Sequence, residues 1–382
     1  METITRRQFL RRVACTSCAL AVAELSLPLS SPAGKGGTAD PKGPDSPPAE
    51  ARYYRRLPNL EVECQLCPRR CRVADLERGF CGVRENRGGT YYTLVHSRPA
   101  ALNIDPIEKK PFFHFLPSTL TFSLATAGCN IHCKFCQNWE LSQVRPEQIS
   151  SFYLPPAAAA TEAQRQSCAS IAYTYSEPVV FFEYMVDTAR AARKKGLRNV
   201  VVTNAFIDPE PLRELCRQVD AIKVDLKAFT DKFYREVCNG ELKPVLQSLQ
   251  LLQKHGIWYE IVYLVVPTLN DQEEPIRKMC LWIKRELAPD VPLHFTRFQP
   301  MYLLKNLPPT PIESLERARQ IALAEGLRFV YLGNVPGHEG ENTYCPRCRK
   351  TLIRRLGYTV RENNVRKGTC RFCGERIPGV WG

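Results

Sequence analysis

The nine residues GCNIHCKFC, at positions 128–136, place three cysteines on one short stretch, with gaps of three and then two residues. They follow a run at residues 121–126 whose β-rich composition predicts a strand. Three thiolates at this spacing suit a four-iron cluster, because three irons take sulfur ligands while the fourth stays open to a cofactor or substrate. The alternative is a structural zinc site that uses His132 as a fourth ligand, although His132 lies directly beside Cys133.

Strand and helix patterns alternate from this loop onwards. Further strands are predicted at residues 171–175, 199–203, 221–226, 258–266, 293–298 and 327–332. Amphipathic helices separate them, for example one from about Phe182 to Gly196 and another at 311–325. Continuously apolar strands that alternate with helices are typical of a parallel sheet covered by helices. We therefore expect an α/β fold, as an open or partial barrel, with its chemistry at the carboxyl ends of the strands.

Polar residues follow three of the predicted strands. Ser176 and Glu177 come after the second strand, Asn204 after the third, and Asp225 and Lys227 end the fourth. Strand alternation puts Asp225 and Lys227 on the same face. Two of these groups also have a purely structural interpretation. Ser176 and Glu177 precede a proline as a helix cap would, and an isolated Asp–Lys pair is often only a salt bridge.

The central triplet resembles the signature of radical S-adenosylmethionine (SAM) enzymes, in Cys129, Cys133 and Cys136 and in the aromatic Phe135 before the last cysteine. The resemblance implies a partial (β/α)6 radical SAM barrel and a [4Fe–4S] cluster whose open iron binds SAM. It also implies a low-potential electron donor, such as a ferredoxin or flavodoxin. The delivered electron cleaves SAM, and the resulting 5′-deoxyadenosyl radical abstracts hydrogen from a substrate.

The same resemblance implies roles for individual residues. The expected SAM contacts are Phe135, Ser176, Glu177, Asn204, Asp225, Lys227 and Val266. Two runs depart from the pattern of the family. Residues 175–177 read Tyr-Ser-Glu where a Gly-Gly-Glu-like segment is usual, and residues 202–205 read Val-Thr-Asn-Ala where glycyl-radical activating enzymes have Asp-Thr-Asn-Gly. Cys238 matches a cysteine of the family, which implies a role as hydrogen-atom donor or on the substrate side.

Longer runs at residues 80–86, 136–140 and 333–339 are similar to one branch, the radical SAM protein of the AmmeMemoRadiSam system. This likeness extends from about residue 60 to residue 382. It implies Memo-like and AMMECR-like proteins as partners. It leaves the substrate unknown, with a protein-bound substrate as one option. Activation of a glycyl-radical enzyme is the alternative within the same chemistry.

Two further sets of four cysteines flank the predicted barrel, which we expect at residues 118–335. The first set lies in a Cys-rich module expected at 51–117 and consists of Cys64, Cys67, Cys71 and Cys81. Such a set suits either zinc or an auxiliary iron–sulfur cluster, and the sequence leaves both open. The charge of the thiolates would be offset by nearby arginines, namely Arg69, Arg70, Arg72 and Arg78.

The second set forms two Cys-x-x-Cys knuckles separated by 21 residues. Its members are Cys345, Cys348, Cys370 and Cys373. Four thiolates complete the coordination of one zinc ion, so we expect a structural zinc in a zinc-ribbon-like module at residues 336–382.

Composition limits the remaining classes. The chain has 382 residues, of which 44% are hydrophobic, and this excludes a wholly disordered chain, a coiled coil and a polytopic membrane protein. Its 17 clustered cysteines favour metal sites over disulfides. A formal charge of +14 would suit an acidic partner. A zinc-dependent nucleic-acid-binding protein is therefore the competing class, although no aromatic and basic ladder supports it.

The first 30 residues resemble a twin-arginine export signal, with Arg6 and Arg7 before a weakly apolar stretch. Glu24 and Pro28 make that stretch a poor membrane span, so no transmembrane span is expected. Residues 31–50 are rich in proline and glycine and are interpreted as a linker. Because SAM and low-potential reductants are cytoplasmic, we expect catalysis in the cytoplasm.

Overall fold

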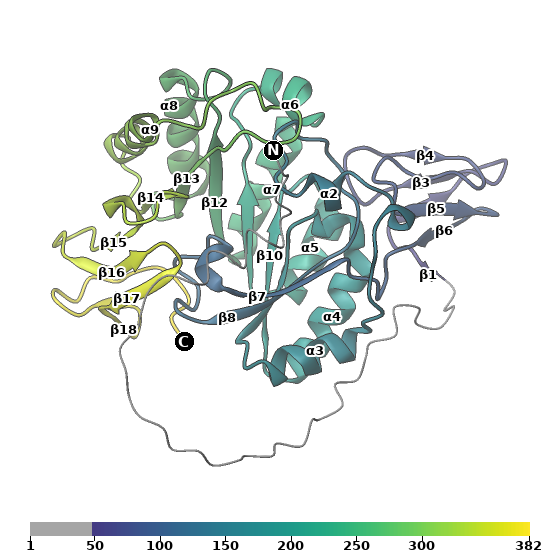
Figure 1. Cartoon of the computed structure of the whole chain (residues 1–382), viewed down its shortest axis with the longest axis horizontal. Helices are drawn as coiled ribbons and strands as arrows, with labels where there is room; N and C mark the ends of the chain where they lie inside the picture. Colours follow the sequence, from purple (N-terminus) through teal and green to yellow (C-terminus); the bar gives the residue numbers. More distant parts are fainter. Residues whose placement is uncertain (1–47) are drawn as a thin grey trace, which may run out of the picture. The chain divides into compact units, whose positions relative to one another are not determined.

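The computed structural model describes residues 48–382 (Figure 1). The export signal and nearly all of the linker expected before residue 50 lie outside the described residues. No helix within 48–382 is long and apolar enough to cross a membrane.

A mixed sheet of eight strands forms the centre of the described chain. Its strands are β7 (Ala101–Pro106), β8 (Leu120–Ala125), β9 (Ser170–Tyr173), β10 (Arg198–Thr203), β11 (Ala221–Asp225), β12 (Trp258–Val265), β13 (Leu293–Arg297) and β14 (Val330–Gly333). They lie side by side in sequence order, so the sheet has two free edges and is open. Strands β8 to β14 are parallel, and β7 pairs antiparallel with β8. The expected α/β class and the run of parallel strands are confirmed.

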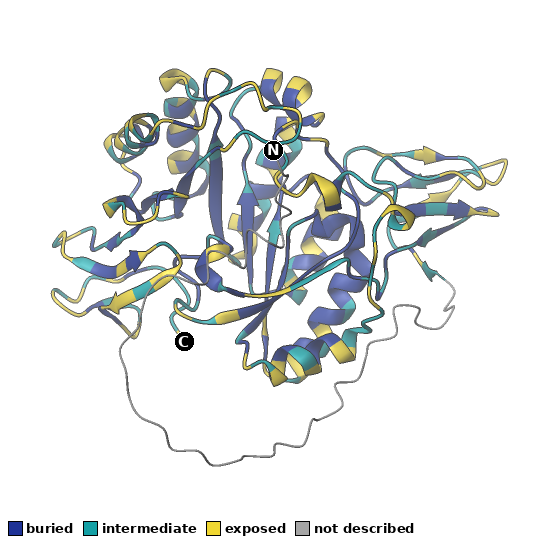
Figure 2. Ribbon diagram, viewed as in Figure 1, coloured by how far each residue is buried: buried dark blue, intermediate teal, exposed yellow. Residues whose placement is uncertain are grey.

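Helices connect the parallel strands. They are α3 (Pro156–Arg165), α4 (Phe182–Lys194), α5 (Pro209–Gln218), α6 (Asp231–Cys238), α7 (Leu242–His255), α8 (Glu273–Trp282) and α9 (Ile312–Ala324). Successive helices contact one another, as α3 with α4, α4 with α5 and α8 with α9, so they cover the sheet as one layer. Figure 2 shows the consequence: the central parallel strands are mostly buried, and exposed residues gather on the outward sides of the helices.

The edge strand β7 was not predicted from the sequence. It lies before residue 118, where we expected the barrel to begin, yet it pairs along its whole length with β8. Asn103 and Ile104 are exposed on it. A half-exposed edge strand with polar residues lacks the continuous apolar run that marked the other strands.

The segment after β7 closes the amino-terminal end of the sheet. Its apolar side chains Ile107, Phe112 and Phe115 pack against Ala172 and Val200 of the central strands. Buried Glu260 of β12 accepts hydrogen bonds from the backbone N–H groups of residues 113 and 114, at 3.0 and 2.9 Å. The opposite end, where the parallel strands finish, is left open for a ligand.

Smaller sheets lie on either side in the chain. Two three-stranded sheets precede β7, one from β1 (Ala49–Glu50), β6 (Thr90–Thr93) and β5 (Arg84–Arg87), the other from β2 (Tyr54–Arg56), β3 (Val62–Cys64) and β4 (Arg72–Val73). After β14 come a sheet of β15 (Thr343–Tyr344), β16 (Thr351–Leu356) and β17 (Thr359–Asn363), and a hairpin of β18 (Val365–Arg366) and β19 (Thr369–Cys370).

Candidate functional site

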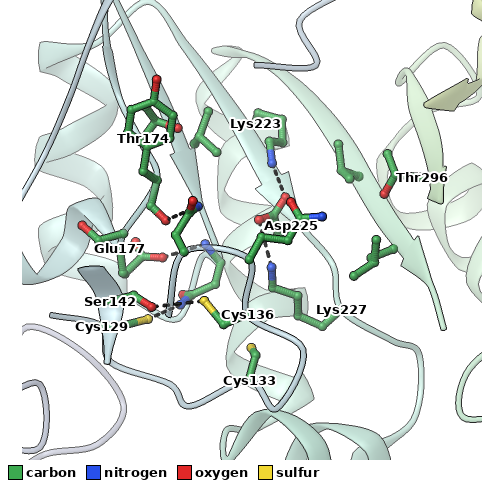
Figure 3. A pocket seen from close by; sticks show the side chains of 18 of the residues that line it. Cys129, Cys133, Cys136, Ser142, Thr174, Glu177, Lys223, Asp225, Lys227 and Thr296 are labelled. Carbon is green, nitrogen blue, oxygen red and sulfur yellow. Dashed lines mark hydrogen bonds and ion pairs between the residues drawn. The ribbon is translucent and has the colours of Figure 1, made fainter. Parts of the chain in front are cut away.

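The loop after β8 carries three cysteines into a pocket at the carboxyl ends of the strands. Cys129, Cys133 and Cys136 all line this pocket, which has a volume of about 360 Å³ (Figure 3). Backbone N–H groups of His132 and Lys134 donate to the carbonyls of residues 238 and 237, both at 2.9 Å, and fix the loop on the end of α6. The pocket therefore lies at the end of the parallel sheet where the sequence predicts the chemistry.

Cys133 is buried, and the other two cysteines of the loop are partly buried. Cys129 accepts a hydrogen bond from the side-chain amide of Asn204 at 3.9 Å, and the sulfur of Cys136 lies 3.1 Å from the hydroxyl of Ser142. Burial is the main reason that the pKa values of Cys129 and Cys136 lie above the usual value for a thiol. Soft sulfur donors in such a site fit a metal cluster, whose positive irons would stabilise the thiolates.

Glu177 is a buried carboxylate at the end of β9, only 3% exposed. It accepts hydrogen bonds from the hydroxyl of Thr203 at 2.5 Å, from the N–H of Asn204 at 2.8 Å, and from the N–H of Val179 at 3.1 Å. Burial raises its pKa to about 7, against these hydrogen bonds, which act in the opposite direction. The side chain therefore both caps the short 3-10 helix at Pro178–Phe181 and lines the pocket.

Asp225 lies between two lysines in the middle of the pocket (Figure 3). It forms ion pairs with Lys223, on the same strand, and with Lys227, whose Nζ lies 2.9 Å away. Burial alone would raise the pKa of Asp225, but the two ammonium groups lower it to about 2. The same burial lowers the pKa of Lys223. This triad places fixed charges of both signs beside the cysteine loop.

Most of the residues expected to contact SAM lie together. Those that line the pocket are Phe135, Ser176, Glu177, Asn204, Asp225 and Lys227. Asn204 also donates to the side-chain oxygen of Asn130 at 2.9 Å, which ties the end of β10 to the cysteine loop.

Two expected residues lie elsewhere. Val266 is buried in the core, and Val262 and Leu264 of β12 line the pocket instead. Cys238 is 0% exposed and does not line the pocket, because it ends α6 behind the loop, within hydrogen-bonding reach of Cys133. A hydrogen-atom donor has to reach its substrate, so this position does not support that role.

Sequence reasoning missed a group of pocket residues around Lys110. This lysine belongs to the segment after β7, and burial lowers its pKa to about 8 although Asp105 lies 2.5 Å from its Nζ. Asp105 also accepts a hydrogen bond from the hydroxyl of Tyr175. No motif marks Lys110. Lys223, in contrast, was detectable, because it precedes Asp225 and Lys227 at the two-residue spacing of one strand face.

The C-terminal cysteines converge. The sulfurs of Cys345, Cys348, Cys370 and Cys373 all lie within 4.8 Å of one another. Cys345 and Cys373 are 3.6 Å apart, and Cys348 and Cys370 are 3.8 Å apart. Thiolates bound tetrahedrally at about 2.3 Å from one zinc ion would be about 3.8 Å apart, so this site has the right size for zinc.

The first cysteine set shares a separate, small cavity. Cys64, Cys67, Cys71 and Cys81 line it together with Arg69 and Arg84. Three of the arginines expected to face these thiols instead pair with carboxylates: Arg70 with Asp208, Arg72 with Glu61, and Arg78 with Glu85 and Glu147. Arg84 lines the cavity beside the sulfurs instead. It was not predicted from the sequence.

The sequence of this chain is similar to a known family model and to known proteins. A family model described as the radical SAM superfamily matches residues 123–280. The chain is 46% identical over 333 residues to the uncharacterized protein MJ0808 of Methanocaldococcus jannaschii, which covers 87% of this chain and 99% of that protein. It is 21% identical over 211 residues to the pyruvate formate-lyase-activating enzyme of Clostridium pasteurianum, which covers 53% of this chain and 87% of that enzyme.

A crystal structure of a radical SAM methyltransferase from Sphaerobacter thermophilus is similar with a TM-score of 0.46 and 17% identity, over 59% of this chain and 71% of that one. The superfamily implies an iron–sulfur cluster and SAM, and the buried thiols of the central loop fit such a cluster. The chain belongs to the radical SAM superfamily, is related to pyruvate formate-lyase-activating enzymes, and is an enzyme of this class.

Proposed function

We propose that this enzyme holds a [4Fe–4S] cluster on Cys129, Cys133 and Cys136, cleaves SAM reductively and abstracts hydrogen from a substrate whose identity the sequence leaves open. The observation that carries this proposal is the position of the three cysteines after the carboxyl end of β8, in one pocket with Glu177, Asp225 and Lys227. When bound, the cluster and SAM supply the electron transfer and the radical chemistry.

The chain's own residues would bind and orient SAM. Glu177 offers a buried carboxylate to the ammonium group of its methionine part, because a charge-assisted hydrogen bond is strong where water is excluded. Lys227 and Asp225 offer opposite charges, to the carboxylate and to the ribose hydroxyls. Phe135, buried on the loop and 5.9 Å from Phe233 between ring centroids, holds the loop against α6.

The test is anaerobic reconstitution followed by metal and product analysis. We expect about four irons and four sulfides per central site, and 5′-deoxyadenosine after reduction in the presence of SAM. Changing Cys129, Cys133 or Cys136 to Ala should abolish SAM cleavage while the chain stays folded. A single variant that retains full cleavage would overturn the assignment. Zinc alone, with no iron, would favour the nucleic-acid-binding alternative.

The physiological setting belongs to the same proposal. Long runs shared with the AmmeMemoRadiSam branch support Memo-like and AMMECR-like proteins as partners, a ferredoxin or flavodoxin as donor, and catalysis in the cytoplasm. Co-purification with those two proteins from native cells tests the assignment. Relatives named as pyruvate formate-lyase-activating enzymes support the second candidate, activation of a glycyl-radical enzyme. A glycyl-radical signal in electron paramagnetic resonance (EPR), formed on a co-encoded partner, would favour it.

We further propose that Cys345, Cys348, Cys370 and Cys373 bind one structural zinc ion in a zinc-ribbon-like module. The sulfur separations of 3.6 and 3.8 Å support this assignment. Four thiolates leave no open position on the metal, so the ion would stabilise the fold and take no part in the chemistry.

A further inference from the structure

The four sulfurs of the first cysteine set lie around one small cavity, as the ligands of a single metal centre would. Cys71 also accepts a hydrogen bond from the backbone N–H of Phe80 at 3.5 Å. Hydrogen bonds to sulfur stabilise the negative form and tune metal–thiolate centres.

A buried positive charge faces these sulfurs. Arg84 is 1% exposed and lines the same cavity. It pairs with Glu183 at 2.5 Å. Arg69 also lines the cavity. Guanidinium groups at the cavity wall would offset the net negative charge that a metal centre with four thiolates carries.

The spacing of the sulfurs separates this set from the zinc-like one. Within residues 48–382, the C-terminal cysteines are the only group of three or more potential ligands with all ligand atoms within 4.8 Å of one another. The first set lines one cavity but is spread more widely, as is the central triplet. A single zinc ion draws its ligands together, whereas a four-iron cluster spreads them because each thiolate binds a different iron.

The cavity adjoins the central cysteine loop. The carbonyl oxygen of Cys81 lies so close to Gly128 that a Cβ there would be 2.8 Å from it. Arg69 donates to the carbonyl of Asn130 at 2.8 Å, and Asn130 lines the cavity. The ring of Phe80 stacks on His132 with centroids 4.3 Å apart. The segment that carries the first cysteine set and the central cysteine loop are therefore in direct contact.

We propose that Cys64, Cys67, Cys71 and Cys81 hold a second iron–sulfur cluster, which relays electrons to the cluster on the central loop. A reduced ferredoxin- or flavodoxin-type protein gives one electron to the second cluster. The second cluster is then oxidised by one electron as the central cluster is reduced by one, and no atom is transferred. The metal assignment is independent of the proposed function, whereas the relay rests on it.

The metal assignment is tested on the full chain with the central cysteines removed, as C129A/C133A/C136A. After anaerobic reconstitution, this variant should keep about four irons and the Mössbauer spectrum of a cluster, while C64A/C67A should lose an equal amount. Cys280→Ala, which changes a buried cysteine outside all three sets, is the matched control and should keep the iron of the wild type. A C129A/C133A/C136A protein that holds zinc and no iron would overturn the assignment.

The relay is tested by the rate at which the central cluster is reduced. In C64A/C67A, reduction by a flavodoxin-type donor should slow at least tenfold, followed by EPR of freeze-quenched samples. Dithionite, a small reductant that reaches the pocket directly, should still reduce the central cluster, and this separates loss of the relay from loss of the central site. Equal rates with the protein donor in both proteins would overturn the relay.

Discussion

Glu177 is the residue whose ionisation SAM binding should control. In the free pocket burial raises its pKa to about 7, so below that pH the carboxyl is mostly neutral. An ammonium ion placed beside it favours the charged form and lowers the pKa. Binding at pH 6 therefore releases a proton, and the affinity for SAM should rise as the pH increases from 6 to 8.

Calorimetry on the reconstituted enzyme, in buffers of different ionisation enthalpy, measures that proton release. Glu177→Gln should remove the pH dependence and weaken SAM by tenfold or more, because a hydrogen bond to a charged group contributes about 1.5–3 kcal/mol. Wild-type binding that does not change between pH 6 and pH 8 would show that Glu177 does not meet the ammonium group.

A second prediction for a single residue concerns Asp225 and the free energy of unfolding. Asp225→Asn removes the carboxylate that pairs with both the buried Lys223 and the partly buried Lys227. Removing one partner of a buried ion pair costs about 3–5 kcal/mol, so chemical denaturation should show a loss of about that size. The control is Asp187→Asn, at a carboxylate 46% exposed that pairs with Arg190, where the change should be under about 1 kcal/mol.

At the scale of elements, the connection from β8 to the cysteine loop depends on Gly128. Its φ is +95°, and a Cβ there would lie 2.6 Å from a methyl group of Val83. Gly128→Ala should therefore lower both the free energy of unfolding and the iron content after reconstitution. Gly196→Ala is the matched control, since its φ is +75° but no atom lies within 4 Å of the added Cβ. It should cost only about 1 kcal/mol and keep its iron; equal effects of the two changes would contradict this.

The helices and strands also show which parts of the fold and the site could be predicted from the sequence. Parallel strands were predictable because both of their faces are buried, so their apolar runs are continuous, as in β9 and β12. Site residues at strand ends were predictable for the same reason, since a short polar run after such a strand is conspicuous. Lys110 was not predictable as a site residue. It reaches the pocket from the segment after the antiparallel edge strand β7, and no local sequence pattern reveals that β7 pairs with β8.

At the scale of the whole described chain, the C-terminal segment is attached to the closed end of the sheet. His114 lies 2.6 Å from the carbonyl of Pro378 and accepts, at its own carbonyl, from the N–H of Val380 at 2.7 Å. Arg355 donates to the carbonyl of Phe113 at 2.9 Å. Because the same segment carries Lys109 and Lys110 into the pocket, the proposed zinc site and the pocket share a structural support.

Loss of zinc should therefore weaken SAM binding in the pocket but leave the iron content of the clusters unchanged. Cys345→Ser should release one zinc ion, because binding of structural zinc is folding energy. It should also speed proteolysis within residues 343–382 and weaken SAM binding several-fold, while the iron content stays that of the wild type. Tyr358, at the turn between β16 and β17, lines the pocket directly and gives a second route for this effect.

The control Cys216→Ser changes a cysteine outside the three sets and should leave zinc, proteolysis and binding unchanged. Zinc release with an unaltered cleavage pattern would mean that the four thiolates bind an ion on which this part of the fold does not depend.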